Sequence, residues 1–277
     1  MNDLSIGSTL PIGHGIEMPR LGLGTYKSAP GEDTAESVRY ALELGYRQVD
    51  TAALYANEAS VADGIERAGL SRDDVFITTK LWNTEQGYDS ALAALDRSLS
   101  ELRTDHVDLY LVHWPMREHM EGTWRAMEEA LESGKARAIG VSNFLPHHLE
   151  ELMRIAHVAP AVDQVEFHPR LQQPSLQAYL AEHDIALMAW APLVRGAVCT
   201  TPEIVAIAER LGRTAAQVTL RWVLELGYIA IPKSVHADRI AENAGLFDFE
   251  LTEADHEVFA RLDTGTRVGP DPDTYAW

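Results

Sequence analysis

Four residues whose side chains could carry chemistry, Asp50, Tyr55, Lys80 and His113, stand where short apolar runs of the sequence end. A tyrosine, with a pKa of about 10, donates a proton poorly near neutral pH unless a cation stabilises its phenolate. We expect Lys80 to lower the pKa of Tyr55, and Asp50 to hold the lysine charged and in place. His113 would orient a substrate oxygen or relay a proton. Such a set suits the protonation of a carbonyl oxygen during reduction.

None of these side chains can supply a hydride, so carbonyl reduction would require a cofactor. Trp190 offers a flat face for a nicotinamide ring, and Ser142, Asn143 and Gln164 carry the donors and acceptors that a carboxamide needs. Near residue 235 the segment "PKSVHADRIAEN" brings together basic and hydroxyl side chains suited to a phosphate, namely Lys233, Ser234 and Arg239. The alternative for Arg239 is an ion pair with Glu242 on a helix surface.

Other reaction classes find little support. The sequence has no G-x-S-x-G and no H-E-x-x-H motif. His147 and His148 lie together on a predicted helix surface without a spaced partner, so we expect no metal site. Cys199 is the only cysteine, which excludes an internal disulfide and fits a reducing compartment.

The elements that must position these residues alternate regularly along the chain. Short apolar runs at 20–25, 47–51, 75–80, 107–114, 136–143, 161–167, 185–192 and 228–234 each precede an amphipathic stretch. Eight such units predict a parallel sheet with short connections, preceded by a small hairpin at turns near residues 11–15. An open dinucleotide-binding sheet would need G-x-G-x-x-G, but "GLGTYK" has two of the three glycines.

A closed (β/α)₈ barrel accounts better for the polar residues, because it brings the ends of all its strands to one face. Taken singly, each strand-end residue has a structural alternative; Asp50, for example, could cap the next helix. Their joint placement favours a site. We therefore predict a TIM barrel with an N-terminal β-hairpin, formed by residues 1–277 as a single domain.

The net charge limits the partners. With 23 basic and 42 acidic side chains the formal charge is −19, which argues against nucleic acid and anionic membranes as partners. The first twenty residues contain no basic stretch leading into an apolar run, and no segment approaches about 18 uninterrupted apolar residues. We expect a cytoplasmic protein whose phosphate-binding residues form a local exception to its acidic surface.

These residues lie in segments that together resemble the aldo-keto reductase family. The segments are "MPRLGLGT", "ALELGYRQVDTAALYANE", "FITTKLW", "VDLYLVHWP", "GVSNF", "DQVEFHP", "APL", "IPKSV" and "RIAEN", in family order over nearly the whole chain. The resemblance implies a (β/α)₈ barrel that binds a nicotinamide dinucleotide without a Rossmann fold. It also implies that Asp50, Tyr55, Lys80 and His113 form a catalytic tetrad with Tyr55 as general acid.

The same resemblance implies NADPH as cofactor. It places Trp190 against the nicotinamide and assigns Ser142, Asn143 and Gln164 to the carboxamide. It also implies 2′-phosphate contacts from Lys233, Ser234 and Arg239, with Val235 in the same segment, and adenine contacts from Glu242 and Asn243. His236 departs from the threonine or arginine frequent at its position. The segments "TTKLWN" and "FDFELT" are similar to the prokaryotic branch that contains 2,5-diketo-D-gluconic acid reductases.

The substrate is predicted only as a class. Tyr26, Trp82 and Trp114, joined by Tyr275 or Trp277 from a short C-terminal tail, suggest an aromatic-walled pocket for small carbonyl compounds. Keto-sugar acids, keto esters, methylglyoxal and aromatic aldehydes all fit this description, and Trp114 could instead pack the barrel rim. The family resemblance favours a monomer. The alternative function is a nicotinamide-binding regulatory module with little turnover, because the family includes channel-associated subunits.

Overall fold

Eight parallel strands curl into a barrel in the computed structural model, which describes residues 4–13 and 15–275. Each strand pairs with its sequence neighbours, in the order β10-β9-β8-β7-β6-β5-β4-β3. The strands are β3 (Leu23–Gly24), β4 (Gln48–Asp50), β5 (Phe76–Leu81), β6 (Val107–Val112), β7 (Ala136–Ser142), β8 (Val162–Glu166), β9 (Ala186–Trp190) and β10 (Ile229–Ala230).

The first and last strands meet and close the barrel. Parallel bridges join Leu21 to Ala230 and Gly24 to Lys233, and the Gly22 N–H donates to the Ala230 carbonyl at 2.9 Å. A side chain at Gly24 would press against the Ile231 carbonyl, since an added Cβ atom would lie 3.0 Å from that oxygen. The predicted (β/α)₈ fold is therefore confirmed.

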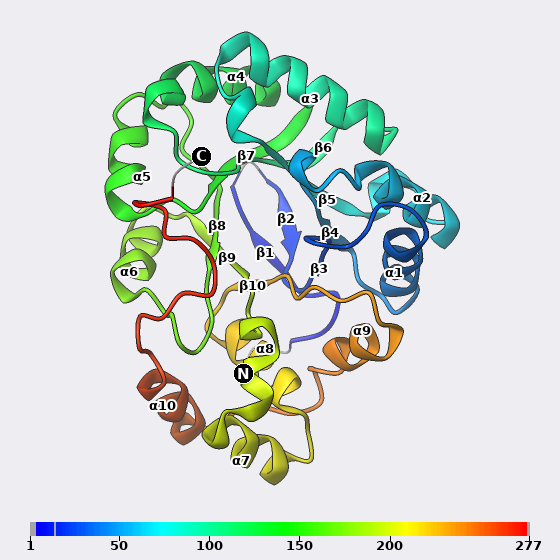
Figure 1. Cartoon of the computed structure of the whole chain (residues 1–277), viewed down its shortest axis with the longest axis vertical. Coiled ribbons are helices and arrows are strands. Elements are labelled where there is room, and N and C mark those ends of the chain that lie inside the picture. The colour runs from blue at the N-terminus through cyan, green and yellow to red at the C-terminus, as the bar shows by residue number, and fades with distance from the viewer. Residues whose placement is uncertain (1–3, 14, 276–277) are drawn as a thin grey trace.

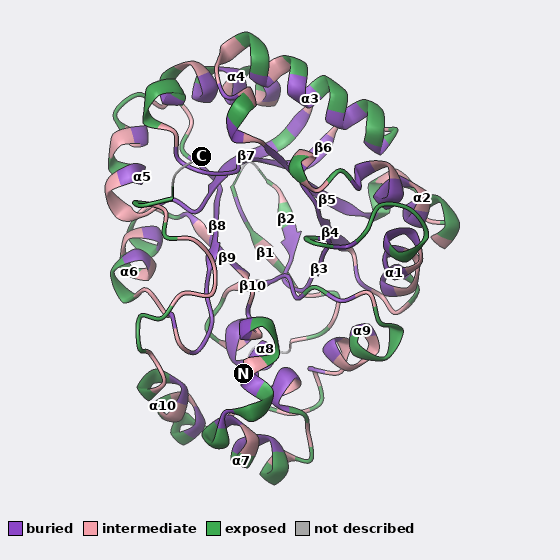
Figure 2. Ribbon diagram, viewed as in Figure 1, coloured by how far each residue is buried: buried purple, intermediate pink, exposed green. Residues whose placement is uncertain are grey.

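Helices surround the barrel and turn their buried faces towards the strands, as the purple inner stripes in Figure 2 show. They are α1 (Glu32–Glu43), α2 (Glu58–Ala68), α3 (Tyr88–Leu102), α4 (Met120–Glu132), α5 (Pro146–Met153), α6 (Pro174–Glu182), α7 (Pro202–Leu211), α8 (Ala215–Glu225), α9 (Ala237–Ala244) and α10 (Glu253–Arg261). In the described part of the chain, no helix is both long and apolar enough to cross a bilayer.

An N-terminal hairpin covers one end of the barrel, as predicted. Its strands β1 (Thr9–Pro11) and β2 (Glu17–Pro19) pair antiparallel. Ile12 and Met18 from this hairpin are buried in one apolar cluster with barrel residues that include Leu109, Val162 and Ile229. Because the hairpin fills this opening, the polar strand ends are left to gather at the opposite face.

Candidate active site

A buried ion pair links the ends of β4 and β5. The Lys80 Nζ atom lies 2.6 Å from Oδ1 of Asp50 and 2.7 Å from the Thr51 carbonyl oxygen. The side chain of Lys80 is 0% exposed and that of Asp50 is 3% exposed. Burial raises the pKa of Asp50 and lowers the pKa of Lys80, and their mutual attraction opposes both shifts. Removing these two charges from water costs desolvation energy, and apolar side chains could fill the same space without that cost.

Tyr55 lies next to this pair. It ends a 3₁₀ turn (Ala53–Tyr55) just beyond β4, and its hydroxyl is 3.5 Å from Lys80 Nζ. Burial raises the pKa of Tyr55 well above 10.0, and the Asp50 carboxylate raises it further. The expectation that Lys80 lowers this pKa is therefore wrong for the structure as it stands. The cause is that Asp50 neutralises the lysine at short range while burial disfavours the phenolate.

His113 completes the group at the end of β6. Its ring lies edge-on to the ring of Tyr55, with centroids 5.8 Å apart. Burial and the Lys80 charge lower the pKa of His113 well below 6.5, so the imidazole is neutral near pH 7. Its Nδ1 atom is buried without a hydrogen-bond partner. A neutral imidazole can orient a substrate oxygen by hydrogen bonding, whereas a protonated imidazole would be repelled by the positive charge of Lys80.

The amide and hydroxyl side chains expected to hold a carboxamide form one network beside this group. Ser142 Oγ donates to the Gln164 carbonyl at 2.7 Å, and Asn143 Nδ2 donates to the His113 carbonyl at 3.0 Å. The Trp190 Nε1 donates to Asn143 Oδ1 at 2.9 Å. Gln164 Nε2 donates to Oδ2 of Asp50 at 2.6 Å, so Gln164 connects this network to the ion pair.

The predicted phosphate-binding cluster follows β10. Lys233 and Arg239 are exposed, and neither forms a salt bridge within residues 4–13 and 15–275. Glu242 accepts a hydrogen bond from Thr214 instead of pairing with Arg239, so the alternative of a surface ion pair is wrong. The buried Ser234 hydroxyl bonds to the backbone of His236, which shapes the turn that leads into α9.

The other members of the cofactor set lie on or beside α9. Asn243 is buried, whereas Val235 and Glu242 are partly exposed and His236 is exposed. Burial lowers the pKa of Lys233. Lys233, in the segment before α9, and Arg239, in the first turn of α9, form the local basic cluster that a phosphate-bearing ligand would need on this acidic protein.

Aromatic side chains surround Tyr55 and His113. The Tyr26 ring lies 5.1 Å from that of Tyr55, and the Trp82 ring lies 5.2 Å from that of His113. Trp114 is 7% exposed and its ring lies 5.1 Å from that of Tyr275 in the C-terminal tail. The structure thus brings all the predicted pocket residues to one face, except Trp277, which lies outside the described residues.

The predicted isolation of His147 and His148 on a helix surface is wrong. His148 is buried, and the C-terminal tail brings Asp273 to within 2.9 Å of His147 Nε2 and 3.4 Å of His148 Nε2. These three residues could in principle hold a metal ion. However, the Leu145 N–H points at His148 Nδ1, 3.2 Å away, which places the ring proton on Nε2. The Nε2–H of His148 then faces Asp273, and this nitrogen offers no lone pair to a metal.

Comparisons with known proteins agree with this geometry. The model of the aldo/keto reductase family matches residues 20–264. The chain belongs to this family. Glyoxal reductase from Bacillus subtilis strain 168 is 48% identical over 269 residues, covering 97% of this chain and 98% of the relative. The resemblance inferred from sequence segments is therefore confirmed.

Two solved structures of family members resemble this reductase closely. A Gox0644 point mutant in complex with NADPH has a TM-score of 0.91 and 44% identity, covering 95% of this chain and 96% of the other. A putative 2,5-diketo-D-gluconic acid reductase B has a TM-score of 0.90 and 36% identity, covering 99% and 96%. The likeness to the 2,5-diketo-D-gluconic acid reductase branch is confirmed.

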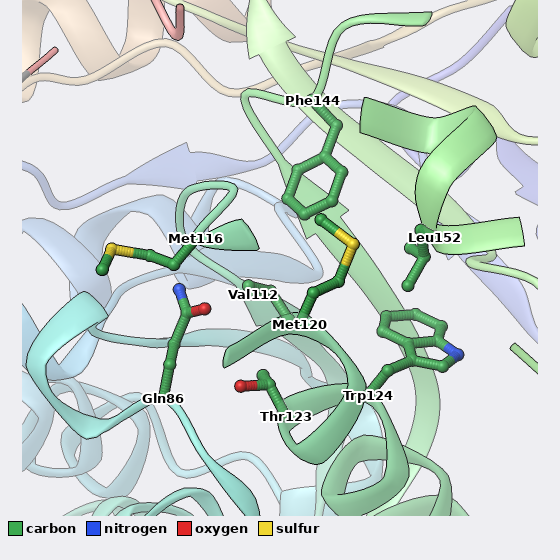
Figure 3. Close-up of a pocket in the computed structure, with 8 residues that line it drawn as sticks. All are labelled: Gln86, Val112, Met116, Met120, Thr123, Trp124, Phe144 and Leu152. Carbon is green, nitrogen blue, oxygen red and sulfur yellow. The ribbon is translucent and has the colours of Figure 1, made fainter. Parts of the chain in front are cut away.

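An apolar cavity behind the strand end of β6 is distinct from the catalytic group. Figure 3 shows its lining, which is Gln86, Val112, Met116, Met120, Thr123, Trp124, Phe144 and Leu152. Its two polar side chains are already bonded, Gln86 to the Trp114 carbonyl and Thr123 to the Gly87 N–H, both at 2.8 Å. The bond from Gln86 to the Trp114 carbonyl holds the loop that carries Trp114, so this lining has a structural role.

Two residues that organise the site were missed at the sequence level. Asn57 Nδ2 donates to the carbonyls of Thr25 and Ser28, and its Oδ1 accepts from Thr51, so it ties the loop after β3 to the loop after β4. Glu166, at the end of β8, contacts the C-terminal tail. Asn57 precedes α2 at a position where asparagine is common as a helix cap, and Glu166 ends a strand like several other polar residues, so neither has a distinct signal in the sequence.

Proposed function

We propose that this reductase converts small carbonyl compounds to alcohols with NADPH, and that Tyr55 is the general acid. The observation that carries the proposal is the placement of Lys80 Nζ 3.5 Å from the Tyr55 hydroxyl, beside a neutral His113 and a buried Asp50. Family membership supports it. The proposal includes a monomeric, cytoplasmic protein, which the family resemblance and the lone Cys199 favour.

The residues present fit the cofactor. When bound, NADPH would supply the hydride. Trp190 is partly exposed and its indole is held at Nε1 by Asn143, so a flat apolar face is available for the nicotinamide. Lys233, Ser234 and Arg239 would hold the 2′-phosphate, with Val235, Glu242 and Asn243 near the adenosine. The NADPH complex of the similar Gox0644 mutant supports this choice.

The proton would come from Tyr55. The hydroxyl is protonated at neutral pH, but its raised pKa makes it a weak acid. Donation to a carbonyl oxygen would therefore depend on the negative charge that develops on that oxygen during hydride transfer. The phenolate left behind would lie near Lys80, whose charge Asp50 maintains. His113, neutral and buried, would orient the carbonyl oxygen without adding charge.

We propose small dicarbonyl compounds as the preferred substrates, followed by keto-sugar acids and keto esters. The aromatic rings of Tyr26 and Trp82 stand close to Tyr55 and His113, which suits a short, flat substrate. The 48% identical relative is named a glyoxal reductase, which supports this order.

Initial rates of NADPH oxidation across glyoxal, methylglyoxal, keto-sugar acids, keto esters and aromatic aldehydes test the proposal. We expect turnover with the dicarbonyls, with the highest kcat/KM for the shortest. Tight NADPH binding with no turnover on any of these compounds would contradict the proposal and favour the nicotinamide-binding regulatory module. Co-purification of a protein partner would then be the next measurement.

A further inference from the structure

The chain after α10 returns across the mouth of the barrel. In Figure 1 this red segment, residues 262–275, runs from α10 past the ends of β8 and β9 towards α5; we call it the C-terminal tail. It is fastened along its length, because Thr264 and Thr266 donate backbone N–H groups to the Arg170 carbonyl and Asp273 contacts His147. The tail therefore lies over strand ends that carry the candidate site.

Glu166 forms the innermost of these attachments. Its side chain is 0% exposed, and its two carboxylate oxygens accept the N–H groups of Val268 and Gly269, the latter at 3.1 Å. His168 Nε2 lies 2.9 Å from the same carboxylate. A fully buried carboxylate is costly unless its oxygens are satisfied, and here the tail backbone supplies most of the donors. The position of the tail and the burial of Glu166 thus depend on each other.

The tail held by Glu166 lies directly against Trp190. A Cβ atom added at Gly269 would collide with Cη2 of the Trp190 indole and would lie 3.1 Å from Oε2 of Glu166. The opposite edge of the indole is fixed by the bond from Nε1 to Asn143. Glu166 and Trp190 are also register partners on β8 and β9. The indole is therefore held at both edges, by Asn143 at Nε1 and by the tail at the benzo ring. A substitution that moves the tail tests the second contact and leaves Asn143 unchanged.

We propose that Glu166 is a positioning residue for Trp190. Its carboxylate seats Gly269 against the benzo edge of the indole and so fixes the plane of the ring. This inference rests on the proposed function in one respect, that the face of Trp190 receives the nicotinamide. Gly269 must lack a side chain because the tail backbone and the indole are in contact. Glu166 acts through the tail and touches neither substrate nor cofactor.

Two substitutions test the proposal from opposite sides. Glu166→Gln replaces one of the two acceptor oxygens by an amide donor, which then faces a backbone N–H. Gly269→Ala leaves the carboxylate intact and pushes the tail away from the indole. In both variants we expect NADPH affinity to fall by roughly tenfold or more, the scale of a lost hydrogen bond to a charged group. Asp273→Asn is the matched control, because it alters a different attachment of the same tail, at α5, and leaves the side chains of Glu166 and Trp190 and the backbone of Gly269 unchanged; its NADPH affinity should equal that of the parent.

A double-mutant cycle separates positioning from a general structural role. In the Trp190→Ala background, Glu166→Gln should cause no further loss of NADPH affinity, since the ring through which it acts is absent. Equal losses in the two backgrounds would overturn the proposal. Hydrogen exchange of the Val268 and Gly269 amides, measured without cofactor, should speed up in Glu166→Gln by roughly tenfold or more; unchanged exchange would also overturn it.

The measurements distinguish a failure of the proposed function from a failure of this inference. If Trp190→Ala alone leaves NADPH affinity unchanged, the nicotinamide does not stack on Trp190 and the cofactor assignment is wrong at that position. The amide exchange and the near-ultraviolet circular dichroism of the indole, both recorded without cofactor, still report whether Glu166 fixes the tail and the ring. A dichroism spectrum unaltered by both Glu166→Gln and Gly269→Ala would contradict the positioning role in either case.

Discussion

The raised pKa of Tyr55 owes more to burial than to its charged neighbours. Lys80 lies within 3.5 Å of the hydroxyl, yet its charge is balanced by Asp50 at 2.6 Å, so the phenolate gains little from it. The pKa of Tyr55 is therefore raised, and the hydroxyl stays protonated across the neutral range. This arrangement favours a proton donor that releases its proton only when an acceptor oxygen becomes negatively charged.

Tyr55→Phe removes this proton and leaves the ring in place. We expect kcat for carbonyl reduction to fall by about 10² to 10⁴, the usual contribution of general acid catalysis, while the dissociation constant of NADPH stays within about twofold. Tyr26→Phe is the control, because it removes a hydroxyl from the exposed ring beside Tyr55 and leaves the bond between Lys80 and Tyr55 in place. Steady-state kinetics with a dicarbonyl substrate make the measurement. Equal turnover in Tyr55→Phe and the parent would refute the assignment.

The positions of the four proposed catalytic residues at strand ends could be predicted from the sequence, whereas their electrostatics could not. Asp50, Lys80 and His113 are found at strand ends because each ends an apolar run, and such ends meet in a barrel. The pKa of Tyr55 depends on how deeply its ring is buried, which no local pattern reports. The role of Glu166 depends on a tail about a hundred residues later in the chain, and its strand-end position gave no sign of that partner.

The turn from β10 into α9 concentrates positive charge on an acidic protein. Lys233 lies at the barrel-closing bridge to Gly24, so its backbone position is fixed by the fold. Arg239 lies in the first turn of α9 and has no ion-pair partner among residues 4–13 and 15–275. An unpaired guanidinium loses no existing ion pair when it binds a phosphate, which is consistent with the proposed contact to the 2′-phosphate.

Arg239→Ala should weaken NADPH much more than NADH. We expect roughly tenfold or more for NADPH, because a charge-assisted hydrogen bond to the 2′-phosphate is lost, and about twofold or less for NADH, which lacks that phosphate. Fluorescence titration of both cofactors gives the comparison. Arg154→Ala, at an exposed arginine after α5, controls for the loss of one positive charge. Equal weakening of both cofactors by Arg239→Ala would show that Arg239 does not contact the 2′-phosphate.

Helix α5 and the C-terminal tail share a histidine whose titration affects stability. Burial, together with the nearby charges of His147 and Arg117, lowers the pKa of His148 to about 4, although Asp273 and Glu151 oppose the shift. Between pH 6.5 and 4 the unfolded chain therefore binds a proton on this histidine that the folded protein does not bind. The free energy of unfolding must fall as the pH drops through that window, so His148 contributes acid sensitivity.

His148→Asn isolates this contribution, since an asparagine Oδ1 can still accept the Leu145 N–H that the ring Nδ1 now accepts. We expect the variant to lose less free energy of unfolding than the parent when the pH is lowered from 7.5 to 5.5. Urea denaturation at the two pH values provides the comparison, with His106→Asn as a control at a partly exposed histidine whose ring pairs with Asp105. The same loss in parent and His148→Asn would contradict the linkage.

At the scale of the whole molecule, the barrel was predictable because its signals are local and repeated. Eight apolar runs alternating with helical patterns leave few topologies, and the missing third glycine in "GLGTYK" argued against the open sheet. The path of the C-terminal tail was not predictable. It is set by contacts of Asp273 with α5 and of the tail backbone with Glu166, which are specific to the folded chain and follow no periodicity.

The net charge of −19 repels an anionic cofactor, so added salt should speed its association rather than slow it. At about 10 mM salt the Debye length is about 30 Å, so the field of the whole acidic molecule acts on an approaching NADPH. At 150 mM salt the Debye length is about 8 Å. Under that condition the proposed contacts of Lys233 and Arg239 would dominate the electrostatic interaction. We expect the association rate constant of NADPH to rise several-fold, on the order of 2 to 10, as KCl is raised over this range.

Stopped-flow quenching of tryptophan fluorescence, at constant pH and viscosity, measures that rate constant. Arg239→Ala should bind more slowly at every KCl concentration and keep the upward trend, because the variant removes local attraction and leaves the surrounding acidic surface. A rate constant that falls with added KCl would mean that the cluster after β10 projects its positive field beyond the protein surface. The acidic remainder of the molecule would then have no influence on how the cofactor arrives.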